Sequence, residues 1–130
     1  MTPHISALYA APLALLMVAL SIHVTMLRAK TKISLLDGGN HQLTERIRRH
    51  GNFVENVPMV LLLMLIAEML GTSSAWLHAV GGILVAARLI HIFGISFDKA
   101  DPMPRIAGGG LTTLATLLAA GNILARVVAG

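Results

Sequence analysis

Four long apolar runs, separated by short polar segments, make up most of this sequence of 130 residues. A run of about 20 apolar residues is long enough to cross the hydrocarbon core of a bilayer as a helix. We therefore predict four membrane-spanning helices, at about residues 4–31, 41–70, 74–97 and 104–128. Because the connections are short, consecutive helices must run antiparallel. The expected fold is all-α: a single integral membrane domain over residues 1–130, built as a four-helix up-and-down bundle.

The composition excludes a water-soluble domain. The chain is 55% hydrophobic and only 12% charged, and its mean hydropathy is +0.76, which leaves too little polar surface for a soluble protein of this size. The net charge of +4 does not indicate a nucleic-acid partner, because the basic residues adjoin the apolar runs and are not interleaved with aromatic residues. Membrane lipid headgroups are the expected partners of these cations.

The sequence contains no cysteine. Any thiol chemistry therefore needs a thiol from another molecule, since the chain has no cysteine nucleophile and no thiolate metal ligand of its own. His23, His41 and His50 show no metal-ligand spacing such as HExxH, and we expect them to be interfacial or packing residues. No metal site is predicted.

Basic residues flank two of the three predicted connections. Near the first connection they are Arg28, Lys30, Lys32, Arg46, Arg48 and Arg49, and near the third they are Lys99 and Arg105. The second connection has none. Because cytoplasmic loops of membrane proteins carry an excess of Lys and Arg, the first and third connections are predicted to be cytoplasmic and both termini non-cytoplasmic.

Small residues recur at spacings typical of helix packing in membranes. They are Gly82 with Ala86, Ala115 with Ala119, and the glycine run at 108–110. We expect close helix contacts at these positions of the third and fourth helices.

Three polar residues, Arg48, Asn52 and Glu55, stand at positions i, i+4 and i+7 where the second apolar run begins. This spacing places them on one face of a helix. With a helical rise of about 1.5 Å per residue, Glu55 and Arg88 fall at similar depth on adjacent antiparallel helices. A lone charge near the bilayer centre costs at least about 2.5 kcal/mol, so we expect Glu55 and Arg88 to pair, with His91 facing Asn52 or Arg48.

This belt of polar residues has two interpretations from the residues alone. It is either a buried ion-pair and hydrogen-bond seam that fixes the register of the helices, or a binding site. The cations at one end of the belt exceed the nearby acids, which favours either headgroup anchors or ligands for an anionic molecule. These cations are Arg28, Arg48, Arg49 and Arg105.

The pattern RxxxNxxE followed by proline, formed by Arg48, Asn52, Glu55 and Pro58, resembles the signature of the MAPEG superfamily, the membrane-associated proteins in eicosanoid and glutathione metabolism. Two further segments are similar to the family: ARLIH at 87–91 in the third helix and PRIAGGGLT at 104–112 opening the fourth. The likeness covers nearly the whole chain. The short length and the RHGNFVENVP segment most resemble the small bacterial branch.

This resemblance implies a homotrimer in a bacterial inner membrane, with the co-substrate glutathione bound between adjacent protomers in the cytoplasm-facing half of the bilayer. It implies that Arg105 is catalytic, by stabilising the glutathione thiolate. The implied glutathione-binding residues are Arg28, Arg48, Asn52, Glu55, Arg88 and His91.

The activity implied by the resemblance is that of a glutathione transferase or peroxidase acting on a lipophilic electrophile. The alternative is a non-catalytic lipid- or partner-binding protein on the same frame. The chain departs from eicosanoid-pathway members at Asn56 and Ile95, where those members have tyrosine.

Overall fold

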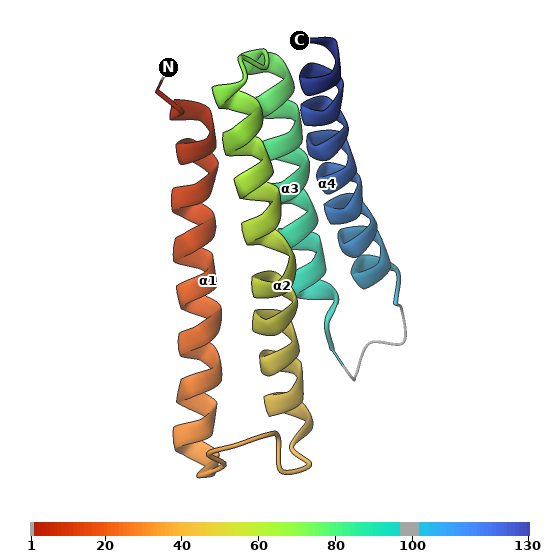
Figure 1. Cartoon of the computed structure of the whole chain (residues 1–130). Helices are drawn as coiled ribbons and strands as arrows, with labels where there is room; N and C mark the ends of the chain where they lie inside the picture. The colour runs from red at the N-terminus through yellow and green to blue at the C-terminus, as the bar shows by residue number, and fades with distance from the viewer. Residues whose placement is uncertain (1, 97–101) are drawn as a thin grey trace.

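The computed structural model describes residues 2–96 and 102–130, which form four α-helices. These are α1 (His4–Thr31), α2 (His41–Met69), α3 (Ser74–Gly94) and α4 (Met103–Ala129) (Figure 1). Each of the four is long and apolar enough to cross a membrane. The prediction of an all-α membrane protein with four spanning helices is confirmed.

Local signals in the sequence explain where α2 begins and ends. The Oδ1 atom of Asn40 accepts a hydrogen bond from the Leu43 amide at 3.0 Å and so caps the start of α2. Beyond the end of α2, Gly71 adopts a φ of 78°, a left-handed conformation that favours glycine. Helix α3 ends at Gly94, earlier than the predicted end at residue 97, which itself lies outside the described residues. The residue that caps α3, Ile95, accepts hydrogen bonds at its carbonyl oxygen from the Arg49 side chain of α2.

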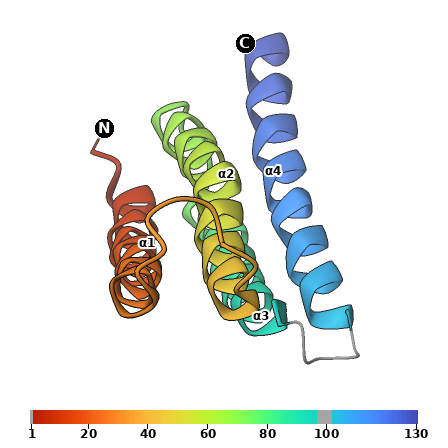
Figure 2. The same ribbon diagram turned by 90° about the horizontal axis from the view of Figure 1, so that it is seen from below.

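The helices form an open row in which α2 and α3 occupy the middle (Figures 1 and 2). Helix α1 packs on α2 and α3, and α4 packs on α3 and α2; across the described residues α1 and α4 do not touch. Both outer helices keep large apolar side chains exposed, such as Leu15 at 72% and Leu117 at 64%. These outward faces are suited to lipid, whose chains are as apolar as leucine.

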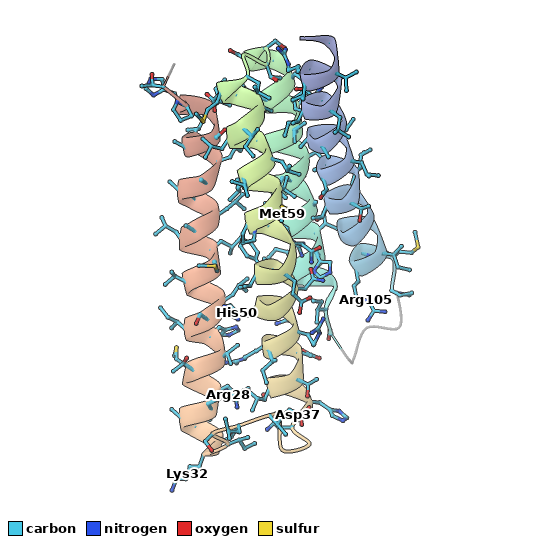
Figure 3. All side chains as sticks on the ribbon, in the orientation of Figure 1. Arg28, Lys32, Asp37, His50, Met59 and Arg105 are labelled. Atoms are coloured by element: carbon cyan, nitrogen blue, oxygen red, sulfur yellow. The ribbon has the colours of Figure 1, made fainter. Side chains whose placement is uncertain are left out.

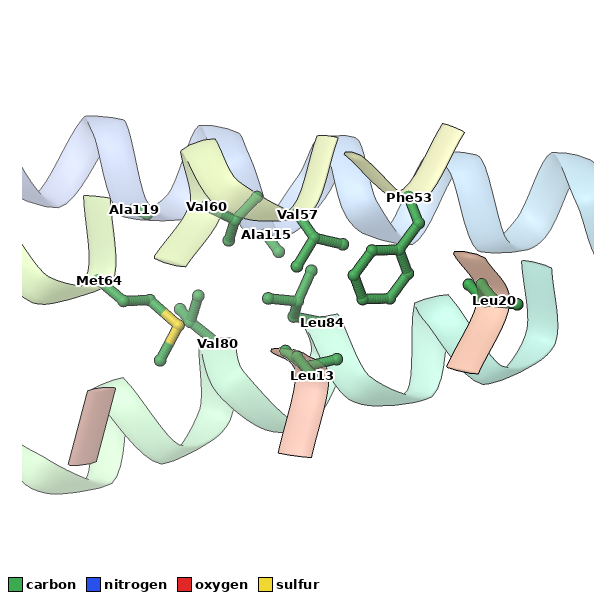
Figure 4. Packing of buried hydrophobic residues seen from close by; sticks show 10 residues of the cluster. All are labelled: Leu13, Leu20, Phe53, Val57, Val60, Met64, Val80, Leu84, Ala115 and Ala119. Carbon is green, nitrogen blue, oxygen red and sulfur yellow. The ribbon is translucent and has the colours of Figure 1, made fainter. Parts of the chain in front are cut away.

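The core lies along α2 and α3 (Figure 4). Helix α2 contributes a stripe at i, i+4, i+7 and i+11, which is the spacing of one helical face: Phe53, Val57, Val60 and Met64. The other helices add Leu13, Leu20, Val80, Leu84, Ala115 and Ala119. Because α4 contributes only alanines to this cluster, its backbone can lie close to α2 and α3.

Glycines set the closest approach between α3 and α4. A Cβ atom at Gly108 would lie 2.6 Å from the His91 Cβ and 2.7 Å from the His91 backbone nitrogen, so only glycine fits. The expected close contacts are confirmed at Gly108 and at the buried Ala115 and Ala119. Within the protomer Gly82, Gly109 and Gly110 make no such contact, because their Cβ positions would have nothing within 4 Å.

A carboxylate from the end of α2 caps the start of α1. Glu68 is 7% exposed, and it accepts hydrogen bonds from the Ile5 amide at 2.9 Å, the Ser6 amide at 2.7 Å and the Ser6 hydroxyl at 2.6 Å. A negative group at a helix N-terminus satisfies amides that have no partner within the helix and complements the helix dipole. This contact joins residues far apart in the chain and was not predicted from the sequence.

Candidate functional site

A pocket of about 220 Å³ opens between the first three turns of α2, the end of α3 and the first turn of α4. It lies toward the end of the molecule that carries the α1–α2 connection. Its lining residues are Thr44, Glu45, Arg48, Asn52, His91, Ile95, Ser96 and Arg105. Four residues proposed from the sequence, Arg48, Asn52, His91 and Arg105, are therefore brought together from three helices.

Arg88 lies directly behind this pocket. Its side chain is 1% exposed; Nη2 donates to Asn52 Oδ1 at 2.8 Å and Nη1 donates to Thr112 Oγ1 at 3.3 Å. The guanidinium carbon also lies 5.8 Å from the centre of the Phe53 ring, within range of a cation–π interaction. Arg88 thus orients the Asn52 side chain that lines the pocket.

The predicted ion pair between Glu55 and Arg88 is wrong within the protomer. Glu55 Oε1 instead lies 3.7 Å from Nη1 of Arg48, and these two side chains are 58% and 56% exposed. At about 100° per residue, Glu55 is rotated roughly 60° around the α2 axis from Asn52, so the asparagine faces α3 and the glutamate turns outward. The spacing alone did not distinguish which of the two residues meets Arg88.

His91 stands on α3, one turn beyond Arg88, and is 3% exposed. The backbone of α4 at Gly108 presses against its Cβ and amide nitrogen, which fixes the imidazole at the pocket wall. Its Nδ1 atom is buried with no hydrogen-bond partner in the described part of the chain. An imidazole nitrogen in this position can donate to or accept from a ligand, depending on its tautomer.

Arg49 links α2 to the end of α3. Its Nε donates to the Ile95 carbonyl oxygen at 3.0 Å, its Nη2 also donates to that oxygen, and Nη2 lies 3.3 Å from Glu45 Oε2. Ile95, Ser96 and Glu45 all line the pocket. From the sequence, Arg49 was predicted only as a surplus cation and Glu45 was not predicted at all, although their i, i+4 spacing is a signal for such a pair.

Arg105 and Arg28 are placed very differently (Figure 3). Arg105 lines the pocket from the first turn of α4. Arg28 lies at the end of α1 and donates to the Ile33 and Leu36 carbonyl oxygens at 3.1 and 2.8 Å. Within one protomer Arg28 therefore closes the α1–α2 connection and does not line the pocket.

Chemically, the pocket is suited to an anionic ligand. Arg48 and Arg105 supply guanidinium groups, which bind carboxylates through two parallel hydrogen bonds, and the amide of Asn52 adds a neutral partner. Residues 2–96 and 102–130 contain no group of three or more His, Asp or Glu residues that could hold a metal ion. The two guanidinium groups of the pocket favour recognition of an anion.

Comparison with known proteins agrees with this description. The model of the MAPEG family matches residues 6–125. The chain is also 42% identical over 90 residues to the inner membrane protein YecN of Escherichia coli K12, covering 69% of each chain, and the YecN protein of Escherichia coli O6:H1 matches equally. The four apolar spans and this similarity support an integral inner membrane protein. The chain belongs to the MAPEG family.

Proposed function

We propose that the protein binds glutathione at the pocket between α2, α3 and α4 and uses its thiolate to attack lipophilic electrophiles. The observation that carries this proposal is the convergence of Arg48, Asn52, His91 and Arg105 on one pocket. Glutathione has two carboxylates, an ammonium group and a thiol, so it needs several cationic partners and a group that favours thiolate. The resemblance of these positions to the family signature supports the same ligand.

Arg105 is the residue assigned to the chemistry. A free thiol has a pKa of about 8.5 and is mostly protonated at neutral pH. A guanidinium within hydrogen-bonding reach stabilises the thiolate and lowers that pKa. A larger fraction of the bound glutathione is then present as the nucleophilic thiolate. In the transferase reaction the sulfur forms a bond to an electrophilic carbon, the leaving group departs with its electron pair, and the thiol proton passes to solvent.

A peroxidase reaction would begin with the same thiolate. The sulfur attacks one oxygen of a hydroperoxide, the O–O bond breaks and an alcohol leaves. A second glutathione then displaces water from the oxidised sulfur to give glutathione disulfide. In both reactions Arg48 and Asn52 hold the peptide part of glutathione, while the apolar substrate arrives from the bilayer beside the pocket.

We further propose that the protein is a homotrimer with glutathione lying between protomers. The exposure of the Arg48–Glu55 pair supports this proposal, because Glu55 lies within the membrane-spanning helix α2, where an exposed charge is costly unless a polar neighbour covers it. Arg28 lies away from the pocket of its own protomer, so any contact with glutathione would have to be made in a neighbour. Native mass spectrometry showing a monomer or dimer would remove this part of the proposal.

A non-catalytic lipid- or partner-binding role is the second candidate. It is favoured by the residues at the two positions where eicosanoid-pathway members have tyrosine. Ile95 presents an apolar side chain at the pocket, and the Asn56 amide donates to the Asn52 carbonyl oxygen at 2.8 Å. Neither position supplies a phenol hydroxyl to a ligand.

Purified protein in detergent separates these candidates. Calorimetry should detect glutathione binding, and a generic electrophile such as chlorodinitrobenzene should be conjugated. Binding without conjugation would favour the non-catalytic role, and no binding would overturn both the transferase and the peroxidase.

Variants distinguish binding from chemistry. Arg48→Ala or Asn52→Ala should lower glutathione affinity by about 10- to 100-fold, because hydrogen bonds involving charged groups are worth about 1.5–3 kcal/mol. Arg105→Ala should retain most of the binding and raise the pKa of the bound thiol by about one unit or more, measured by the ultraviolet absorbance of the thiolate. If Arg105→Ala keeps the wild-type titration, Arg105 does not stabilise the thiolate.

A further inference from the structure

The end of α3 is held from two sides. From α2, the guanidinium of Arg49 donates two hydrogen bonds to the carbonyl oxygen of Ile95, the residue that caps α3. The last carbonyl groups of a helix have no partner within the helix, so a side-chain donor is needed to fix this end. Glu45, one turn before Arg49, holds the same guanidinium through its carboxylate at 3.3 Å.

From the other side, the first turn of α4 rests on the residue next to Ile95. A Cβ atom at Gly94 would lie 2.5 Å from the Arg105 backbone nitrogen and 2.8 Å from the Pro104 carbonyl carbon. The backbone of Arg105 is therefore seated directly on Gly94. A displacement of residues 94–95 must move the backbone from which the Arg105 side chain enters the pocket.

We propose that Arg49 is a positioning residue that sets the place of Arg105 in the pocket through the Ile95 carbonyl and the Gly94 backbone. This inference rests on the proposed role of Arg105 in stabilising the thiolate. The path is short and consists of the Arg49 side chain, the Ile95 carbonyl, the peptide at Gly94 and the Arg105 amide. None of these links requires Arg49 to touch the ligand.

The chain contains a matched control for this proposal. Arg46 lies one turn before Arg49 on α2, and its Nη1 also donates to a backbone carbonyl, that of His23 on α1, at 2.7 Å. Arg46→Gln and Arg49→Gln remove the same charge from the same helix and each break a contact with a backbone carbonyl. Only the Arg49 contact leads to Arg105.

The experiment follows the titration of the glutathione thiolate in wild type, Arg49→Gln, Arg49→Lys, Gly94→Ala and Arg46→Gln. We expect Arg49→Gln and Gly94→Ala to move the midpoint upward, in the direction of Arg105→Ala, by about half a pH unit or more. Arg49→Lys should lie between wild type and Arg49→Gln, since an ammonium cannot reproduce the planar double contact. Arg46→Gln should keep the wild-type midpoint.

The outcomes separate this inference from the function on which it rests. If Arg105→Ala raises the midpoint while Arg49→Gln and Gly94→Ala leave it unchanged, Arg49 does not position Arg105 and the inference is overturned. An equal rise in Arg46→Gln would also overturn it, because loss of charge alone would then explain the shift. If Arg105→Ala itself has no effect, the proposed role of Arg105 fails and this inference fails with it. Should Arg49→Gln not fold, Arg49→Lys decides the question, because a midpoint above that of the wild type supports the inference and a wild-type midpoint overturns it.

Discussion

Arg88 is a cation in the interior of the bundle whose hydrogen-bonding partners in the described chain are neutral side chains. Asn52 and Thr112 accept its hydrogen bonds, and the face of Phe53 adds a cation–π contact. The free-energy cost of burying a charge is offset only by such partners, because water cannot replace a hydrogen-bonding partner that is removed from the interior. The stability of the site should therefore depend on Asn52 more than on Glu55.

A pair of double-mutant cycles tests this dependence. Asn52→Ala and Arg88→Met should show a coupling of about 0.5–3 kcal/mol, as residues in one hydrogen-bonding network do. Glu55→Gln and Arg88→Met should be additive to within about 0.5 kcal/mol, since the two side chains are not paired. Unfolding in mixed micelles measures both cycles. A larger coupling in the Glu55 cycle than in the Asn52 cycle would contradict the assignment.

Asp37, in the α1–α2 connection, is expected to titrate below the ordinary range. The Thr44 hydroxyl and the Gly39 amide donate to its carboxylate and lower its pKa from the usual 3.8. Because the folded pKa is depressed, the stabilisation is present above the unfolded pKa and is lost as pH falls from that value through the folded pKa. Thr44→Val should raise the pKa of Asp37, seen in its carboxyl carbon resonance, whereas Thr113→Val on α4 should not. An unchanged titration in Thr44→Val would refute the role of the hydroxyl.

At the scale of helices, the contact between α3 and α4 depends on the rotation of α4. Gly108 faces α3 and leaves no room for a methyl group, whereas Gly109 faces outward with open space around its Cβ position. These neighbours are about 100° apart around the helix axis. The same substitution should therefore have opposite consequences at the two positions.

Gly108→Ala should destabilise the protein by about 1–3 kcal/mol, because the added methyl group meets the His91 backbone and must push the helices apart. Gly109→Ala should be neutral or stabilise by up to about 1 kcal/mol, since alanine is the better helix former and meets no neighbour. Thermal unfolding in detergent compares the two variants. Equal destabilisation would mean that α4 is rotated differently from the contact described here.

For the whole molecule, the distribution of charge predicts an orientation. Both described termini lie at the end that carries the α2–α3 connection (Figure 1). Most described cations lie toward the opposite end, and Arg126, which donates to the Leu70 carbonyl at 3.1 Å, is the exception. An excess of Lys and Arg on one side favours the cytoplasm for that side.

The absence of cysteine makes this orientation directly testable. A single cysteine placed at Leu35, which is 81% exposed in the α1–α2 connection, should be shielded from a membrane-impermeant maleimide in intact cells. A cysteine at Ser73, in the α2–α3 connection, should react. The reversed pattern would place the termini in the cytoplasm. Arg105 would then lie on the side of the membrane away from the cytosolic thiols.

The sequence was sufficient for the spans, because length and apolar content alone determine what can cross a bilayer. It also placed Arg48, Asn52, His91 and Arg105 in one region. It did not identify the partner of Arg88, because Asn52 and Glu55 differ by a modest rotation around α2 that depends on how the helix packs. Thr112 and Glu68 were missed for a related reason: their partners lie on other helices, and the pattern within one helix does not specify contacts between helices.

The cap that Glu68 forms on α1 bears on how the chain is assembled during synthesis. When α1 is first made, its leading amides have no acceptor within the helix, and the one they finally use is Glu68, synthesised 62 residues after Ser6. Helix α1 is complete only when the far end of α2 has crossed the membrane, and this step does not involve α3 or α4. We therefore expect the cap on α1 to form between the first two helices alone, before the half of the protein that carries Arg88 and Arg105 is added.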